Sequence, residues 1–208
     1  MRVIAMSAMS AVVAVLMALA LSIGVRAESV TPVLTVRLYN TSGIPLPELM
    51  AARGAAESIL RDTGLDVVFR HCGSSVAPGD VVDTCNERLK PSEVVVRVIN
   101  APSFGTSLKP ETYGVAYVVQ ATSRGWLATV FSDRIAQAAT RAAVESGVLL
   151  GRVMAHEIGH LLLGQGYHGT AGVMRAEWPD ALLTHAGEEW RFSSLEASRM
   201  QHLFPTTF

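Results

Sequence analysis

Two histidines and one glutamate in the second half of the chain have the spacing of a catalytic metal site. His156, Glu157 and His160 form an H-E-x-x-H motif within a stretch that reads as helix. Residues four positions apart on a helix differ by about 40° around its axis and by about 6 Å along it, so two imidazoles can reach one ion. Zn²⁺ suits this pair because it binds neutral imidazole nitrogen and can keep one position open for water. The motif therefore predicts a single catalytic zinc ion.

Glu157 is the candidate general base. Its angular position on the helix keeps it from binding the same ion easily, but allows a hydrogen bond to a water held there. Zinc lowers the pKa of a bound water to about 7 and polarises a carbonyl, so attack on a peptide bond becomes feasible at neutral pH. The alternative, a pair of surface histidines, is disfavoured by Glu157 between them and by the apolar neighbours Ile158 and Leu161.

Downstream of the motif, the chain leaves the helix at Gly164, presents His168 and reaches Gly172-Val173-Met174. From His156 to Met174 the sequence resembles the active site of metzincin-type zinc metallopeptidases, the clan that includes the matrixins. It also resembles a group of secreted bacterial metzincin-like proteins. The resemblance implies three ligands, a base, a hinge that ends the helix and a Met-turn methionine beneath the metal. These roles fall on His156, His160 and His168, on Glu157, on Gly164 and on Met174.

The spacing departs from the family pattern. Metzincins have H-E-x-x-H-x-x-G-x-x-H, whereas this chain has one extra residue on each side of Gly164. The specific alternative to His168 is a carboxylate from Glu177, Glu188 or Glu189, as in gluzincin-like sites. His168 would then be an ordinary loop histidine.

Periodicity predicts the elements that must position these residues. The strands are expected at residues 33–39, 66–70, 93–100, 114–120 and 126–131, the last two as a hairpin. A helix should begin near Pro47 and end at Gly64, and Ser132-Asp133 should cap a long helix that runs to Gly164 with a break at Ser146-Gly147. Ser193 and Glu196 form a capping-box pattern that should open a short final helix containing Leu195, Met200 and Leu203. The order indicates one α+β domain.

The resemblance adds detail to this fold class. It implies a zincin-like domain with a twisted mixed sheet of four to five strands, an antiparallel edge strand, an active-site helix and a C-terminal helix after the Met-turn. Residues 114–118 would be the edge strand, on which a peptide substrate lies, so that Gly114, Val115, Ala116 and Tyr117 are candidate substrate-binding residues. The alternative is a half-buried hairpin strand without that role. The wall of the specificity pocket is expected within residues 175–192.

The first 27 residues have the layout of a secretory signal peptide. Arg2 precedes an uncharged run from Val3 to Val25, and Val25-Arg26-Ala27 supplies small residues before a cleavage point. An uncleaved membrane anchor is the alternative. We therefore expect residues 28–208 to form the exported domain, in the periplasm or outside the cell.

Cys72 and Cys85 are the only cysteines. In a chain bound for an oxidising compartment, one disulfide between them is the expected arrangement. The alternative is a zinc site built from His71 and the two cysteines, which lacks a fourth ligand at a familiar spacing.

Composition excludes several functional classes. The chain has 208 residues with 17 basic and 18 acidic side chains, and only two lysines, Lys90 and Lys109, so it has no basic field for a nucleic acid. An apolar content of 50% excludes a disordered chain. We expect a monomer that acts on a peptide or protein substrate.

Three aromatic residues near the motif have two interpretations each. Tyr167 either packs or donates a hydrogen bond to a developing oxyanion. Trp178 and Trp190 are expected to fill the core rather than line a cleft.

A non-catalytic exported protein that uses zinc for binding or stability is the alternative to an enzyme. Glu157 favours the enzyme, because a structural zinc site needs no base.

Overall fold

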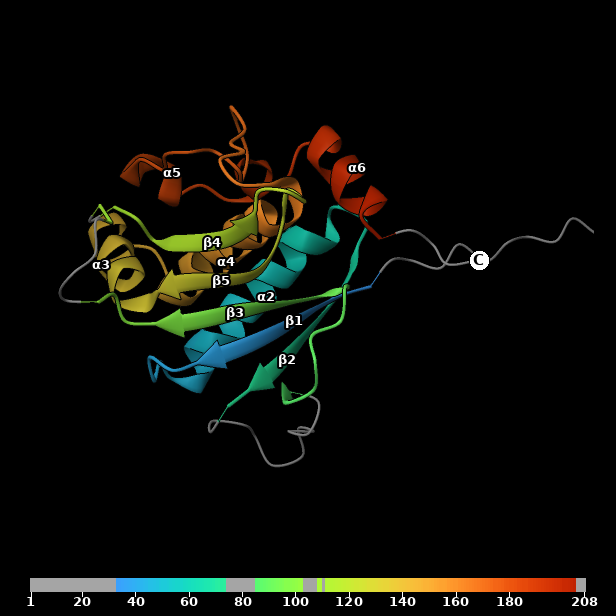
Figure 1. Cartoon of the computed structure of the whole chain (residues 1–208). Coiled ribbons are helices and arrows are strands. Elements are labelled where there is room, and N and C mark those ends of the chain that lie inside the picture. Colours follow the sequence, from blue (N-terminus) through green and yellow to red (C-terminus); the bar gives the residue numbers. More distant parts are fainter. Residues whose placement is uncertain (1–32, 74–84, 103–107, 110, 205–208) are drawn as a thin grey trace, which may run out of the picture. The chain divides into compact units, whose positions relative to one another are not determined.

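The structure is a computed structural model that describes residues 33–73, 85–102, 108–109 and 111–204 (Figure 1). The described residues all belong to one compact unit. The predicted signal peptide, residues 1–27, lies outside them. Within the described part of the chain, no helix is both long enough and apolar enough to cross a membrane.

The centre of the fold is a mixed sheet of five strands in the order β2-β1-β3-β5-β4. Strands β2, β1, β3 and β5 run parallel to one another, and β4 pairs antiparallel with β5. The predicted sheet with an antiparallel edge strand is therefore confirmed. The strands are β1 (Val33–Asn40), β2 (Asp66–Cys72), β3 (Glu93–Ile99), β4 (Gly114–Val119) and β5 (Arg124–Phe131).

Alternation along the strands decides which face of the sheet is covered. Leu34, Val36 and Leu38 of β1 are buried on one face, and the same face continues through Val94 and Ala128 of the neighbouring strands. Helices α2 (Leu46–Arg61), α3 (Ser132–Ala142) and α4 (Ser146–Leu163) contain the residues that complete this core. In Figure 1, α2 and α4 lie behind the sheet.

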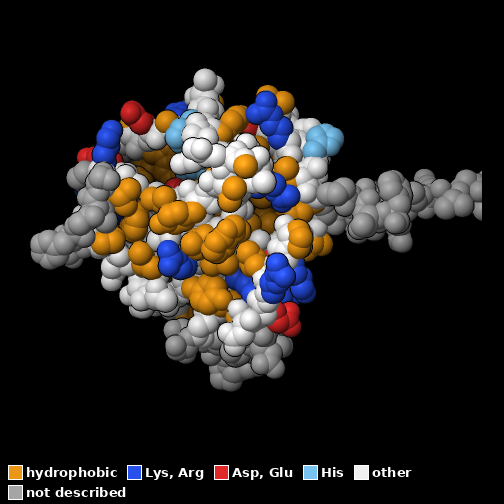
Figure 2. Space-filling model, viewed as in Figure 1, with side chains coloured by type: hydrophobic (Ala, Val, Ile, Leu, Met, Phe, Trp, Pro, Cys, Tyr) orange, Lys and Arg blue, Asp and Glu red, His pale blue; other side chains and the backbone are white. Residues whose placement is uncertain are grey.

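The opposite face of the sheet carries exposed apolar side chains next to the edge strand. Tyr117, Val119 and Trp126 are 51%, 49% and 53% exposed. Figure 2 shows this face, on which hydrophobic side chains gather over β4 and β5.

Helices α2 and α4 approach closely because small residues face each other. A Cβ added to Gly151 would lie 2.3 Å from the carbonyl oxygen of Ala52, and one added to Gly147 would lie 2.8 Å from that of Glu48. Contacts this short are not tolerated, so both positions require glycine for the close approach. The approach buries α4 at the centre of the fold, where 14 of its 18 residues are buried.

The predicted helix break and cap are both wrong in detail. The break lies at Ala143, which adopts a left-handed conformation with φ 54°, and Ser146 begins α4 instead of interrupting it. Ser146 is held there because its hydroxyl donates a 2.7 Å hydrogen bond to Glu48. Ser132 is the first residue of α3 rather than its cap, and its hydroxyl donates to the carbonyl of Ile99.

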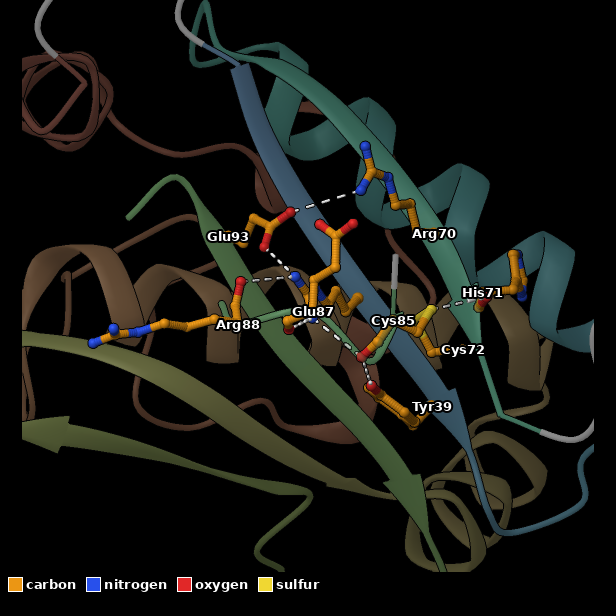
Figure 3. The surroundings of a disulfide bond; sticks show 9 residues. Tyr39, Arg70, His71, Cys72, Cys85, Glu87, Arg88 and Glu93 are labelled. Carbon is orange, nitrogen blue, oxygen red and sulfur yellow. Dashed lines mark hydrogen bonds and ion pairs between the residues drawn. A yellow bond between two sulfur atoms is a disulfide. The ribbon is translucent and has the colours of Figure 1, made fainter. Parts of the chain in front are cut away.

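The disulfide between Cys72 and Cys85 is confirmed, with an S–S distance of 2.00 Å (Figure 3). It joins the end of β2 to the segment before β3, and residues 74–84 between them lie outside the described part of the chain. The Arg37 guanidinium donates to the carbonyls of Cys85 and Glu87, and the Tyr39 hydroxyl also donates to Cys85. Both sulfur atoms belong to the disulfide, so the alternative zinc site built from His71 and the two cysteines is excluded.

The segment after α4 is less irregular than expected. It contains α5 (Asp180–Leu183), the 3₁₀ helix η2 (Gly187–Trp190) and α6 (Ser194–His202). The capping box of α6 is confirmed, because Ser193 accepts from the backbone of Glu196 and Glu196 accepts from that of Ser193. Leu195 and Met200 lie in α6 as predicted, whereas Leu203 caps its end.

Candidate metal centre

Three histidines gather at one point beside the edge strand. His156 and His160 lie one turn apart on α4, and their Nε2 atoms are 3.1 Å apart. His168 lies in the loop after α4, and each of the three offers a nitrogen within 4.8 Å of the other two. Among the described residues, no other group of three or more such side chains meets this condition.

The loop that brings His168 to the helix is shaped by Gly164. This residue ends α4 with φ 108°, a conformation that favours glycine, and its N–H donates a 3.0 Å hydrogen bond to the carbonyl of His160. The chain then turns, and the N–H of Gly169 donates to the carbonyl of Met174 at 2.9 Å. The extra residues around Gly164 are therefore accommodated in the turn without moving His168 away from the pair.

The ring of His156 is held in the form that binds metal. Its Nδ1–H donates a 2.7 Å hydrogen bond to the carbonyl of Val173, which leaves the lone pair on Nε2, the atom that faces His160. Burial lowers the pKa of His156 to about 4. Burial and the neighbouring His156 lower the pKa of His160 to about 3. Both rings are therefore neutral at neutral pH.

The geometry of the pair fits zinc. Two nitrogens bound to one tetrahedral zinc ion at about 2.0–2.1 Å lie about 3.3 Å apart. The observed separation of the Nε2 atoms is 3.1 Å. Three neutral imidazoles are a familiar ligand set for catalytic zinc, and they leave the fourth position open.

Met174 forms the floor of the site. It is completely buried, and a Cβ added to Gly159 would lie 2.4 Å from its sulfur and 2.9 Å from the ring of Phe192. Gly159 precedes His160, so the methionine packs against the helix turn that carries the histidines. The preceding residue, Val173, is tied by its N–H to the carbonyl of Arg191 at 3.1 Å.

Glu157 lies on the side of α4 that faces the edge strand. Its side chain is buried, and a Cβ added to Gly114 would lie 2.7 Å from its Oε1. Burial raises the pKa of Glu157 to about 8. A cation bound beside it would act in the opposite direction and lower that pKa.

A cavity of about 860 Å³ opens above these residues. Its lining includes the three histidines, Glu157 and Val153, together with Gly114 to Ala116 of β4 and residues 175–180. In Figure 2 the surface is hollowed above β4, with histidine side chains at the edge of the hollow. The cavity therefore joins the histidine cluster to a free strand edge.

Two solved structures have a similar fold. A zinc-dependent peptidase from Methanocorpusculum labreanum matches with a TM-score of 0.51 and 15% identity, over 79% of this chain and 99% of its own. Metalloproteinase-II from Bacteroides fragilis matches with a TM-score of 0.51 and 15% identity, over 85% of this chain and 54% of its own. The chain has a zinc metallopeptidase-like fold.

No protein-family model matches the chain, and no curated protein is similar to it. At 15% identity the two structures establish the metallopeptidase-like fold alone.

This fold brings most of the predicted site residues together. His156, His160 and His168 converge, Glu157 and Gly114 to Ala116 line the same cavity, and Met174 lies beneath α4. The carboxylates offered as alternative ligands do not join the cluster. Glu188 and Glu189 form ion pairs with Arg191 and Arg175, and Glu177 reaches only the wall of the cavity.

Two predicted positions do not face the cavity. Tyr117 is 51% exposed and does not line it, because it alternates with Ala116 and points to the other face of the sheet. Tyr167 turns towards α6, where burial and Glu196 raise its pKa and Arg199 lies 5.6 Å from its ring. The packing interpretation of Tyr167 is the one that its contacts support.

Trp178 lines the cavity, which the sequence did not predict. Trp190 is 3% exposed and belongs to the core as expected. Trp178 instead lines the cavity, with its ring edge-on to His156 at a centroid distance of 5.3 Å. Its position inside the segment expected to form the pocket wall was the available signal.

Proposed function

We propose that the chain is an exported zinc-dependent endopeptidase. The observation that carries this proposal is the convergence of three histidines, two of them held neutral, with the buried carboxyl of Glu157 in one cavity beside a free strand edge. A closed structural zinc site needs neither the open cavity nor the acid.

Each residue of the cluster has a role in this proposal. His156, His160 and His168 hold the zinc ion, and Met174 supports them from below. When bound, zinc supplies a Lewis acid and a water of lowered pKa. Glu157 accepts a proton from the attacking water and donates it to the leaving nitrogen of the peptide.

Strand β4 binds the substrate. It is an edge strand, so its outer N–H and C=O groups are available to an extended peptide. Gly114, Val115 and Ala116 line the same cavity as Glu157, which supports the binding of an extended peptide across this site. Residues 175–180 form the opposite wall and contact the substrate side chains.

The proposed location is the periplasm or the cell exterior. Residues 1–27 have the layout of a signal peptide, and the disulfide between Cys72 and Cys85 is typical of oxidising compartments. The proposed partner is a peptide or protein.

Elemental analysis of the purified protein, with His168→Ala beside the wild type, tests the metal site. We expect about one zinc per wild-type chain and much less in the variant, because one of three ligands is lost. Equal zinc content in both proteins would mean that a group other than His168 is the third ligand. No zinc in either, after purification without chelators, would overturn the proposal.

Glu157→Gln tests catalysis separately from metal binding. The amide keeps the size of the side chain but cannot accept the proton, so we expect full zinc content and no detectable cleavage in a peptide-library assay. A non-catalytic zinc protein would show no cleavage in the wild type either.

A further inference from the structure

Arg152 is a buried cation on the active-site helix. It is the only charged residue between Ser146 and His156, lies one turn before His156, and is 8% exposed. Burying a guanidinium is costly unless its donors are satisfied. The Arg152 donors bind the carbonyls of Leu183 at 2.7 Å and His185 at 2.8 Å. The side chain therefore joins α4 to the segment that follows the Met-turn.

The same guanidinium lies over an aromatic ring. Its central carbon is 4.1 Å from the ring centroid of Trp190. The indole N–H of Trp190 donates a 2.9 Å hydrogen bond to the carbonyl of His185, which Arg152 also binds. Trp190 is thus fixed in orientation by Arg152 and by the carbonyl that they share.

Trp190 in turn contacts the wall of the cavity. Its ring is edge-on to Trp178 at a centroid distance of 4.9 Å, and Trp178 is edge-on to His156 at 5.3 Å. Arg152, Trp190, Trp178 and His156 therefore form a continuous line of contacts that leaves α4 and returns to it one turn later.

The neighbours of Trp178 give it little other support. Ala176, Glu177, Pro179 and Asp180 are all exposed. Within this stretch, Trp178 is the partly buried side chain that packs against the core. Its ring contacts His156 on one side and Trp190 on the other, so Trp190 is one of the groups that fix its position.

We propose that Trp178 determines which substrate side chains enter the cavity and that Arg152 is the positioning residue that holds Trp178 through Trp190. The proposal rests on the proposed peptidase function. Arginine is required because only its planar fork can bind two carbonyls and stack on a ring at once, whereas lysine offers a single ammonium group.

Two peptides that differ only in the residue next to the cleaved bond, alanine or phenylalanine, test the proposal. We expect the ratio of their kcat/KM values to change by roughly tenfold in Trp178→Ala and Arg152→Met, and by less in Arg152→Lys, with zinc content unchanged. An arginine that only stabilised the fold would lower both kcat/KM values by the same factor. An unchanged ratio in all three variants would overturn the proposal.

A fluorescence measurement tests the positioning without catalysis. In a Trp126→Phe background, Trp178 and Trp190 are the remaining tryptophans, and Co²⁺ bound beside His156 should quench Trp178. We expect the quenched fraction to fall in Arg152→Met, or in Arg152→Lys if the methionine variant does not fold. Equal quenching with and without the intact arginine would overturn the positioning role. If the wild type cleaves no peptide, the proposed function fails while this measurement still decides the role of Arg152.

Discussion

The Nδ1–H of His156 donates a 2.7 Å hydrogen bond to the carbonyl of Val173, a residue 17 positions away in the sequence. This contact connects α4 to the turn that carries Met174. It fixes both the tautomer and the orientation of the first proposed ligand. The turn that carries Met174 therefore contacts α4 through its backbone, and the Met174 side chain packs against Gly159 of the same helix.

The contact between Gly159 and Met174 predicts an effect on stability. In Gly159→Ala the new methyl would lie 2.4 Å from the Met174 sulfur and 2.9 Å from Phe192, so we expect a loss of about 1–3 kcal/mol in the free energy of unfolding. Gly54→Ala is the matched control, because Gly54 lies in α2 with nothing within 4 Å of the added methyl. There we expect a gain of about 0.5–1 kcal/mol. Urea denaturation of the two variants checks both, and a stabilised Gly159→Ala would contradict the packing described.

The contact between Gly114 and Glu157 predicts an effect on activity. In Gly114→Ala the new methyl would lie 2.7 Å from the carboxylate, which must move. We expect kcat/KM to fall by roughly a hundredfold with zinc content unchanged, because a displaced base loses its alignment. Tyr117→Ala changes the other face of β4 and should leave kcat/KM within about threefold of the wild type. Equal losses in the two variants would show that β4 acts through its stability alone.

The buried interactions of Glu93 should make the stability of the protein depend on pH. Burial alone would raise its pKa, but the N–H of Lys90 and the guanidinium of Arg37 outweigh burial and hold the pKa of Glu93 below its ordinary value. The folded pKa is therefore lower than the unfolded one. The ionised group stabilises the protein above its unfolded pKa, and that contribution is lost as the pH falls through the folded pKa.

We expect the free energy of unfolding of the wild type to fall more steeply than that of Glu93→Gln as the pH is lowered from about 5. Urea denaturation of the metal-free proteins at several pH values measures this difference. Asp66→Asn is the control, because Asp66 forms an ion pair with Arg61 that is about half exposed and is screened by solvent. Parallel curves for the wild type and Glu93→Gln would rule out the stabilising role of Glu93.

Removal of the disulfide should lower the stability of the protein without lowering its zinc content. It closes a short loop at β2, and β2 and β4 lie at opposite edges of the sheet. Replacing Cys72 and Cys85 by serine should lower the free energy of unfolding by about 3 kcal/mol and leave zinc content at the wild-type level. Denaturation and elemental analysis of the double variant measure the two quantities. Loss of zinc would mean that the histidine cluster depends on the far edge of the sheet.

Several parts of the fold followed from local patterns. Alternation at Leu34, Val36 and Leu38 marked β1, and the pair Ser193 and Glu196 marked the start of α6, because both signals depend on neighbours in the sequence. The position of the break between α3 and α4 did not follow from local patterns. Ser146 and Gly147 are poor helix residues by local preference, but a hydrogen bond to Glu48 and close packing on α2 place them inside α4.

For the site, the sequence alone determined that His156 and His160 can share an ion and that Glu157 lies beside them, because the helix period fixes their relative positions. The tertiary structure decided that His168 joins them despite its unusual spacing, since the turn at Gly164 sets where the loop returns. It also decided that Trp178 faces the cavity whereas Trp190 enters the core. Both tryptophans are large apolar side chains, and only the long-range contacts with Arg152 and His156 separate their roles.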